Sequence, residues 1–201
     1  MVLNVFPNED EKFRNPCFYS TGLHPWHVNP GTMEKHLDWV ERKADNPQVL
    51  AIGEIGFDKT IDVSWKDQEY AFERQLALAV KLNKPVILHC VRAYNELIKY
   101  RSKANQKIPW IFHWFNASVE IARDLIRKNC YLSFGHLLFN ETSKAFRVFP
   151  EIPAGSLFLE TDDASFSIQE ISDRAAFLKG LPLSNLMQHI HSNFITCFGI
   201  H

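Results

Sequence analysis

The sequence predicts a parallel α/β fold of the TIM-type (β/α) barrel class, on two observations. Strand-like and helix-like segments alternate along the 201 residues, an order typical of a parallel sheet covered by helices. Four of the strand-like segments are short apolar runs of the kind that is buried on both faces of a sheet. Each run ends on a residue that can bind a metal, namely Glu54, His89, His113 and Asp162. The length suits one core, so residues 1–201 are expected to form a single domain.

The first half of the chain carries four predicted strands, with helices after the second and the third. The first strand stops at Pro7, which cannot donate a hydrogen bond to a neighbouring strand. Residues 33–44 carry apolar side chains at helical spacing, and Ser64 can cap the helix that follows the third strand. The four strands are expected at Val2–Phe6, Phe18–Leu23, Val49–Glu54 and Pro85–His89.

The second half continues the alternation with three more strands and then becomes purely helical. Ser167 and Glu170 have the spacing of a capping box, and Gly180 ends the helix that they begin. These strands are expected at Trp110–His113, Tyr131–Phe134 and Leu157–Thr161, and the helices near 93–104, from Ser118, at Asn140–Phe149, from Ser167, and from Leu183 to Cys197. Seven strands are one fewer than a closed barrel needs, so we expect an incomplete barrel with a helical C-terminal tail.

Composition excludes several classes of protein. The formal net charge is -1, so a polyanionic substrate would need a local basic patch. The four cysteines show no C-x-x-C spacing, which favours buried thiols in a reducing compartment. Residues 1–7 lack the features of a signal peptide, and no apolar run is long enough for a membrane span. We therefore expect a cytoplasmic protein.

The four residues at the strand ends suggest ligands that converge on a divalent metal, because parallel strands bring their carboxyl ends to one edge. Mixed carboxylate and imidazole ligands suit Zn²⁺, Mg²⁺ or Mn²⁺ and do not choose among them. Each residue also has an ordinary structural reading. Glu54 could be a turn residue, and Asp162 could cap the helix that follows it.

Four motifs make the assignment specific: Gly22–Pro25, Ala51–Asp58, Pro85–Cys90 and Glu160–Asp162, in that order. Together they resemble the TatD family of metal-dependent hydrolases, within the amidohydrolase-like barrels. The resemblance runs from about Tyr19 to Gly199. It implies a distorted β/α barrel with one or two divalent metals, and an enzyme that hydrolyses phosphodiester bonds, typically a deoxyribonuclease, with nucleic acid as its substrate.

The resemblance also implies roles for individual residues. Glu54 would be a metal ligand that bridges when two metals bind, and His89 and His113 would hold the second metal. Asp162 would bind the first metal and act as the catalytic residue that orients or deprotonates the attacking water. His24 would contact substrate, although a lone H-x-x-H is otherwise a loop or core motif. Arg92 could bind a phosphate or lie on a solvated helix face.

One departure from the family is large. Family members begin with a strand that carries H-x-H, and this chain has no H-x-H. The sequence corresponds to the family from its second strand onward, so we expect one metal ion rather than two, weak or absent activity, and self-association through open barrel edges. Two other functions stay open. The chain could hydrolyse an amide or ester such as an aminoacyl bond on the same scaffold, or it could be a catalytically impaired homologue that binds metal.

Overall fold

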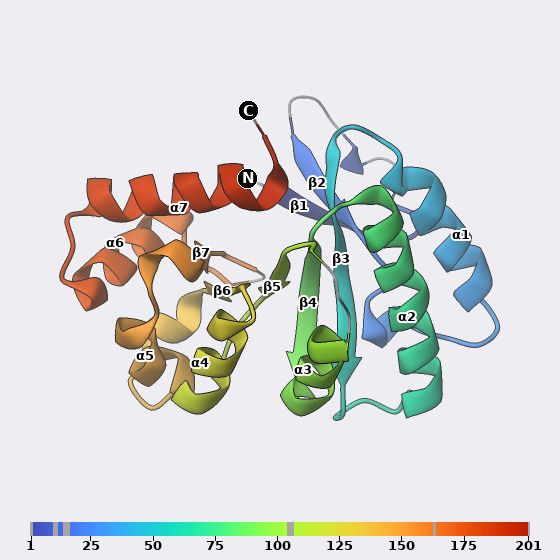
Figure 1. Ribbon diagram of the computed structural model, residues 1–201, viewed down its shortest axis with the longest axis horizontal. Coiled ribbons are helices and arrows are strands. Elements are labelled where there is room, and N and C mark those ends of the chain that lie inside the picture. Colours follow the sequence, from blue (N-terminus) through green and yellow to red (C-terminus); the bar gives the residue numbers. More distant parts are fainter. Residues whose placement is uncertain (1, 10–11, 14–16, 104–106, 163, 201) are drawn as a thin grey trace. The chain divides into compact units, whose positions relative to one another are not determined.

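The computed structural model describes residues 2–9, 12–13, 17–103, 107–162 and 164–200. These residues form two compact units, Met1–Trp110 and Ile111–His201 (Figure 1). Within the described ranges, no helix has both the length and the apolar character needed to cross a bilayer.

The first unit contains a parallel sheet whose strands follow one another in chain order. They are β1 (Val2–Val5), β2 (Phe18–Thr21), β3 (Val49–Asp58) and β4 (Val86–Val91). The helices α1 (Met33–Ala44) and α2 (Trp65–Leu82) lie on the same face of this sheet, and α3 (Tyr94–Lys103) follows β4 (Figure 1). Side chains from β1, β2, β3 and α1 form one core cluster, made of Val5, Tyr19, Trp39, Val40 and Val49. The predicted alternation is confirmed here.

Strand β3 differs from the prediction because it does not end at Glu54. It continues to Asp58, and β4 likewise continues past His89 to Val91. The pairing of these strands shifts by one residue, since Ile52 faces Val86 whereas Ile55 faces Leu88. The extra residue forms a bulge around Glu54, and a bulge re-aims the side chains of the bulged strand. The bulge of β3 therefore positions Glu54, and the interior of β4 positions His89.

Helix α2 holds two site segments through a pair of buried glutamines, seven residues apart on one helix face. The side chain of Gln75 accepts from the Leu23 N–H at 2.6 Å and donates to the Leu23 carbonyl at 3.2 Å. The side chain of Gln68 accepts from the Asp58 N–H at 2.9 Å and donates to the Asp58 carbonyl at 3.0 Å. Each glutamine thus bonds both backbone groups of one residue, Asp58 at the end of β3 or Leu23 just after β2, and fixes that residue against α2.

The second unit begins within β5 (Trp110–Phe112) and contains β6 (Cys130–Phe134) and β7 (Leu157–Leu159), with β6 and β7 parallel. Its helices are α4 (Val119–Arg127), α5 (Lys144–Val148), α6 (Ile168–Lys179) and α7 (Leu183–Phe198), with 3₁₀ turns η3 (His136–Phe139), η4 (Phe149–Glu151) and η5 (Ala154–Ser156). The capping box of Ser167 and Glu170 forms as predicted, and Gly180 ends α6 in a left-handed conformation. Helix α5 starts later than predicted, because the Asn140 side chain accepts from the Thr142 N–H at 3.0 Å in a turn.

Asn193 on α7 ties this helix to the start of β7. Its amide donates to the carbonyls of Ala154 at 2.7 Å and Leu157 at 2.8 Å, and the residue is only 6% exposed.

We expect Asn193→Asp to lower the free energy of unfolding by about 3 kcal/mol or more, because a buried carboxylate would face two carbonyl oxygens. Urea denaturation followed by circular dichroism measures this. The control is Asn185→Asp at an exposed position of the same helix; equal losses in both variants would contradict the role of Asn193.

Candidate metal centre

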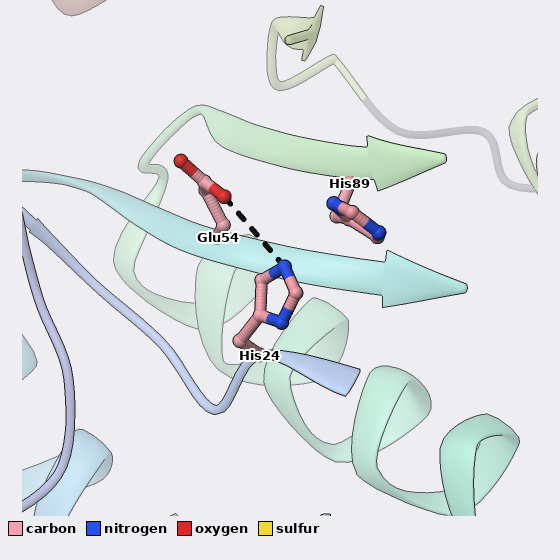
Figure 2. A group of neighbouring side chains, drawn as sticks. All are labelled: His24, Glu54 and His89. Atoms are coloured by element: carbon pink, nitrogen blue, oxygen red, sulfur yellow. Dashed lines mark ion pairs between the residues drawn. The ribbon is translucent and has the colours of Figure 1, made fainter. Parts of the chain in front are cut away.

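Three polar side chains of the first unit converge at the carboxyl-terminal side of its sheet. His24 follows β2, Glu54 comes from the bulge of β3, and His89 comes from β4 (Figure 2). One potential ligand atom from each of them lies within 4.8 Å of the other two. The residues are 6%, 9% and 4% exposed, respectively. A carboxylate and two imidazoles are thus gathered out of water, and residues of these types can serve as ligands of a divalent metal.

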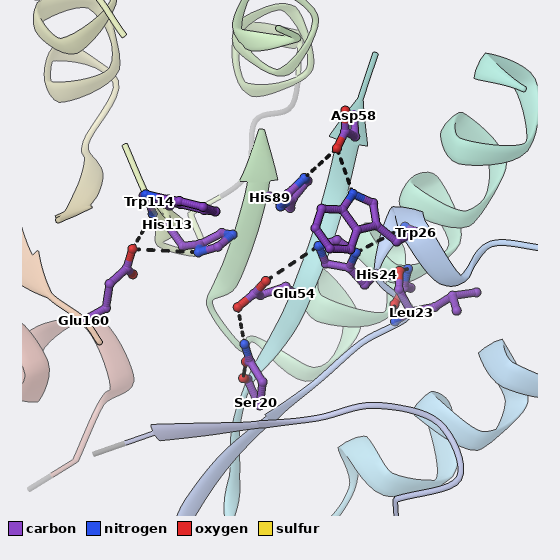
Figure 3. A network of polar contacts seen from close by, with 12 residues as sticks. Ser20, Leu23, His24, Trp26, Glu54, Asp58, His89, His113, Trp114 and Glu160 are labelled. Atoms are coloured by element: carbon purple, nitrogen blue, oxygen red, sulfur yellow. Dashed lines mark hydrogen bonds and ion pairs between the residues drawn. The ribbon is translucent and has the colours of Figure 1, made fainter. Parts of the chain in front are cut away.

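Asp58 fixes the orientation of His89. The Nε2 atom of His89 lies 3.2 Å from Oδ2 of Asp58 (Figure 3). Burial opposes ionisation of this carboxyl, but hydrogen bonds from Thr60, Trp26 and His89 outweigh burial and lower the pKa of Asp58 to about 2. Ionised Asp58 can only accept, so His89 carries its proton on Nε2. Its Nδ1 is then the unprotonated nitrogen, which is the form that a metal ligand needs.

His24 has the opposite arrangement of its ring nitrogens. Its Nδ1 accepts from the Trp26 backbone N–H at 3.2 Å, so the neutral ring carries its proton on Nε2. That Nε2 lies 3.8 Å from Oε2 of Glu54, and the ring lies 4.3 Å from the His89 ring, centroid to centroid (Figure 3). With a proton on the nitrogen that faces the cluster, His24 is a hydrogen-bond donor to whatever occupies the site. The substrate contact expected for His24 stays a prediction.

Two residues of neighbouring strands hold the carboxylate of Glu54. The Asn4 side-chain amide in β1 donates to Oε1 of Glu54, and the Ser20 hydroxyl in β2 donates to the Asn4 side-chain oxygen. Asn4 thus engages Oε1 of Glu54, whereas Oε2 is the oxygen nearest to His24 (Figure 3). Satisfied polar networks of this kind restrict a buried side chain to one orientation.

The second unit contains its own polar cluster after β5. His113 is 7% exposed, and its Nδ1 lies 3.8 Å from Oε1 of Glu160, which follows β7. The same carboxylate oxygen accepts from the Trp114 backbone N–H at 2.5 Å. Burial raises the pKa of Glu160, which His113 partly offsets. His113 is therefore a buried histidine beside a carboxylate, and its role as a metal ligand stays a prediction.

The remaining predicted residues, Asp162 and Arg92, are exposed. Both have left-handed backbone, with φ of 47° at Asp162 and 55° at Arg92, as does Trp114 with φ of 45°. These three residues follow β7, β4 and β5, respectively. Sparsely populated backbone conformations cluster at functional sites. All three residues thus leave the carboxyl-terminal end of a strand through the left-handed region. The predicted roles of Asp162 and Arg92 stay predictions.

Sequence reasoning assigned no role to Asn4, Asp58 or Glu160, although a signal existed for each. Asn4 interrupts an apolar strand, a position where a polar side chain calls for a partner. Asp58 and Glu160 lie inside the motifs that carry the family resemblance. The sequence-based prediction took one metal ligand from each motif and so missed Asp58 and Glu160, which lie beside His89 and His113.

One known protein family matches most of this chain. The family model described as TatD related DNase matches residues 8–199. The chain belongs to the TatD-related DNase family. The resemblance drawn from its four motifs is thus confirmed.

Relatives of this TatD-family chain include two bacterial proteins. An uncharacterized metal-dependent hydrolase, YabD, of Bacillus subtilis is 35% identical over 148 residues, which are 72% of this chain and 58% of that protein. A 3'-5' ssDNA/RNA exonuclease TatD of Pantoea ananatis is 30% identical over 186 residues, which are 90% of this chain and 71% of that protein. The match to YabD thus spans less than two thirds of the relative.

Two solved structures share the fold. The TatD homologue YjjV of Escherichia coli has a TM-score of 0.86 at 22% identity, over 100% of this chain and 86% of that chain. A TatD-family hydrolase of Entamoeba histolytica has a TM-score of 0.80 at 16% identity, over 98% of this chain and 83% of that chain. The predicted class, a TIM-type barrel fold with a helical C-terminal segment, is confirmed, and the described residues form seven strands.

Proposed function

We propose that this chain hydrolyses phosphodiester bonds of single-stranded nucleic acid, with one divalent cation bound at Glu54 and His89. The observation that carries the proposal is the buried cluster of these two residues with His24, whose ligand atoms lie within 4.8 Å of one another in a member of a DNase family. Relatives named as ssDNA/RNA exonucleases support single-stranded DNA or RNA as the substrate class.

The donor set fits a hard or borderline cation. Glu54 offers carboxylate oxygen, and His89 offers an imidazole nitrogen whose tautomer Asp58 selects. This set suits Zn²⁺, Mg²⁺ and Mn²⁺ alike. For His113 and Asp162, the proposed roles as metal ligand and catalytic carboxylate rest on the family motifs.

A bound divalent cation supplies positive charge that polarises a phosphoryl oxygen and lowers the pKa of water. The chain's own residues supply orientation and proton transfer. The His24 Nε2–H would donate to a phosphate oxygen, and Arg92 would pair with a phosphate of the substrate through its guanidinium. Asp162 would orient the attacking water and take up its proton. Asn4 and Asp58 would act only as positioning residues, for Glu54 and His89 respectively.

Hydrolysis of a labelled single-stranded oligonucleotide tests the proposed function. We expect residues 1–201 to cleave it slowly with Mn²⁺, Mg²⁺ or Zn²⁺, because the first strand carries no H-x-H, and cleavage should stop when EDTA is added. Asp162→Asn should lower the rate about 100-fold or more, since it removes a general base while leaving size unchanged. Asp173→Asn, at an exposed position of α6, is the control and should cleave at the wild-type rate.

Two results would overturn the proposal. One is the absence of cleavage of DNA and RNA with all three metals while an aminoacyl ester is hydrolysed, which would assign the site to ester or amide chemistry. The other is an Asp162→Asn variant with unchanged circular dichroism and a wild-type rate, which would remove Asp162 from the reaction.

A further inference from the structure

Trp26 is a large aromatic side chain that stays exposed beside the buried cluster. It lies in the 3₁₀ turn η2 (Pro25–His27), and 59% of it is accessible to solvent. Its ring centroid is 5.1 Å from that of His24 and 5.8 Å from that of His89, in edge-to-face arrangements (Figure 3). A tryptophan that touches both histidines yet remains open to solvent has a free surface directly at the site.

Hydrogen bonds hold both the side chain and the backbone of Trp26 in place. Its Nε1–H donates to Oδ2 of Asp58 at 2.8 Å, and its backbone N–H donates to Nδ1 of His24 at 3.2 Å. Asp58 is itself fixed, because Oδ1 accepts from the Thr60 N–H at 2.8 Å. An anchored ring loses little further conformational entropy when a ligand stacks on it.

Trp26 also forms part of the wall of a pocket in the first unit. The pocket has a volume of about 810 Å³, and Phe6, His27 and Val63 contribute to its lining. A volume of this size accommodates an organic ligand of the dimensions of a nucleoside. Aromatic and imidazole surfaces in the lining suit a flat, aromatic guest.

The charge of the pocket lining favours an uncharged base over a negatively charged phosphate. Glu9, Asp62 and Asp67 line the pocket, and Glu9 pairs with Lys12 at 2.6 Å. Asp62 and Asp67 thus give the described lining negative charge rather than the arginine and lysine side chains that bind phosphate. A nucleobase is uncharged near neutral pH, so these carboxylates do not repel it. These carboxylates would repel a phosphate, which would instead bind at the cluster of His24, Glu54 and His89, whose residues do not line this pocket.

We propose that Trp26 and this pocket form a base-binding subsite, in which a nucleobase next to the scissile phosphate stacks on the indole. The inference rests on the proposed function, since it specifies how that site would recognise a single-stranded substrate. Stacking of bases on aromatic side chains tolerates every base, because every base has a π-face. The subsite would thus favour unpaired nucleotides without selecting a sequence.

Two measurements test the subsite. The first compares kcat/KM for an oligonucleotide whose cleaved nucleotide carries a base with kcat/KM for the same oligonucleotide with an abasic residue there. We expect the wild-type chain to prefer the base by roughly 5- to 150-fold, the range of one base–aromatic stack. Trp26→Ala should bring the ratio near one. Trp26→Phe keeps an aromatic ring without the Asp58 contact and should retain most of the preference.

The second measurement is the binding of a dye-labelled thymidine oligonucleotide in EDTA, by fluorescence anisotropy, which does not depend on turnover. Trp26→Ala should weaken it roughly 5- to 150-fold. Tyr70→Ala is the control, because Tyr70 is an exposed aromatic of α2 whose hydroxyl accepts from Arg74. It should bind as the wild type does.

The outcomes separate this inference from the proposed function. If Trp26→Ala slows both substrates equally and binds the oligonucleotide as the wild type does, Trp26 only positions Asp58 and His89, and the subsite is refuted. If the wild type cleaves no nucleic acid but its binding still depends on Trp26, the proposed function fails while the subsite stands. Cleavage with an unchanged base preference in Trp26→Ala refutes the subsite alone.

Discussion

Replacing Glu54 by glutamine is expected to reduce the affinity for a divalent metal by about 100-fold or more, and hydrolysis should be lost with it. Substitutions of residues that only orient metal ligands already cost about 10- to 100-fold in affinity, so removal of a ligand charge should cost at least as much. The amide keeps the shape of the carboxylate and can still accept from Asn4. The fold should therefore survive. Titration calorimetry with Mn²⁺ and Zn²⁺ measures the affinity.

The metal-induced rise in thermal stability gives an independent measurement. A ligand at 100 times its dissociation constant stabilises a native protein by about 2.7 kcal/mol. At the same metal concentration, a 100-fold weaker site in Glu54→Gln should gain only about 0.4 kcal/mol or less. The control is Glu41→Gln, since the Glu41 side chain is 51% exposed and pairs with Lys81 on the surface. Wild-type metal affinity in Glu54→Gln would remove Glu54 from the site, and so would a gain in stability on adding metal that matches the wild type.

Replacing Gly56 by alanine is expected to destabilise the first unit by about 4 kcal/mol or more. Gly56 has φ of 137°, a conformation that residues with a side chain rarely adopt. A Cβ atom added there would lie 2.1 Å from the His89 carbonyl oxygen and 3.1 Å from the His89 carbonyl carbon. Both are backbone atoms of the paired strand β4, so neither can move without breaking the β3–β4 ladder. Backbone strain and a steric clash thus act together.

Urea denaturation measures the loss, and Gly155→Ala is the matched control. A Cβ atom at Gly155 would meet no atom within 4 Å. Alanine there should change the free energy of unfolding by less than about 1 kcal/mol. The explanation fails if Gly56→Ala is as stable as the wild type, or if both glycine variants lose the same stability.

The sequence by itself determined the elements whose causes are local. Apolar spacing fixed α1, and the capping box of Ser167 and Glu170 with Gly180 fixed both ends of α6. These signals act within a few residues, so no knowledge of the neighbours was needed. The family motifs also indicated Glu54 and His89 correctly as neighbours. The late start of α5 was missed, because Asn140 can begin either a helix or a turn.

Only the tertiary structure decided how the site is built. The bulge that aims Glu54 depends on the register between β3 and β4, and register is a property of two strands together. The tautomers of His24 and His89 depend on Trp26 and Asp58, and the backbone of Leu23 depends on Gln75 from a helix 52 residues further along the chain. The motifs thus indicate which residues are the predicted metal ligands, because that choice depends on residue type. Ligand orientation arises from hydrogen bonds between distant segments, which exist only once the chain has folded.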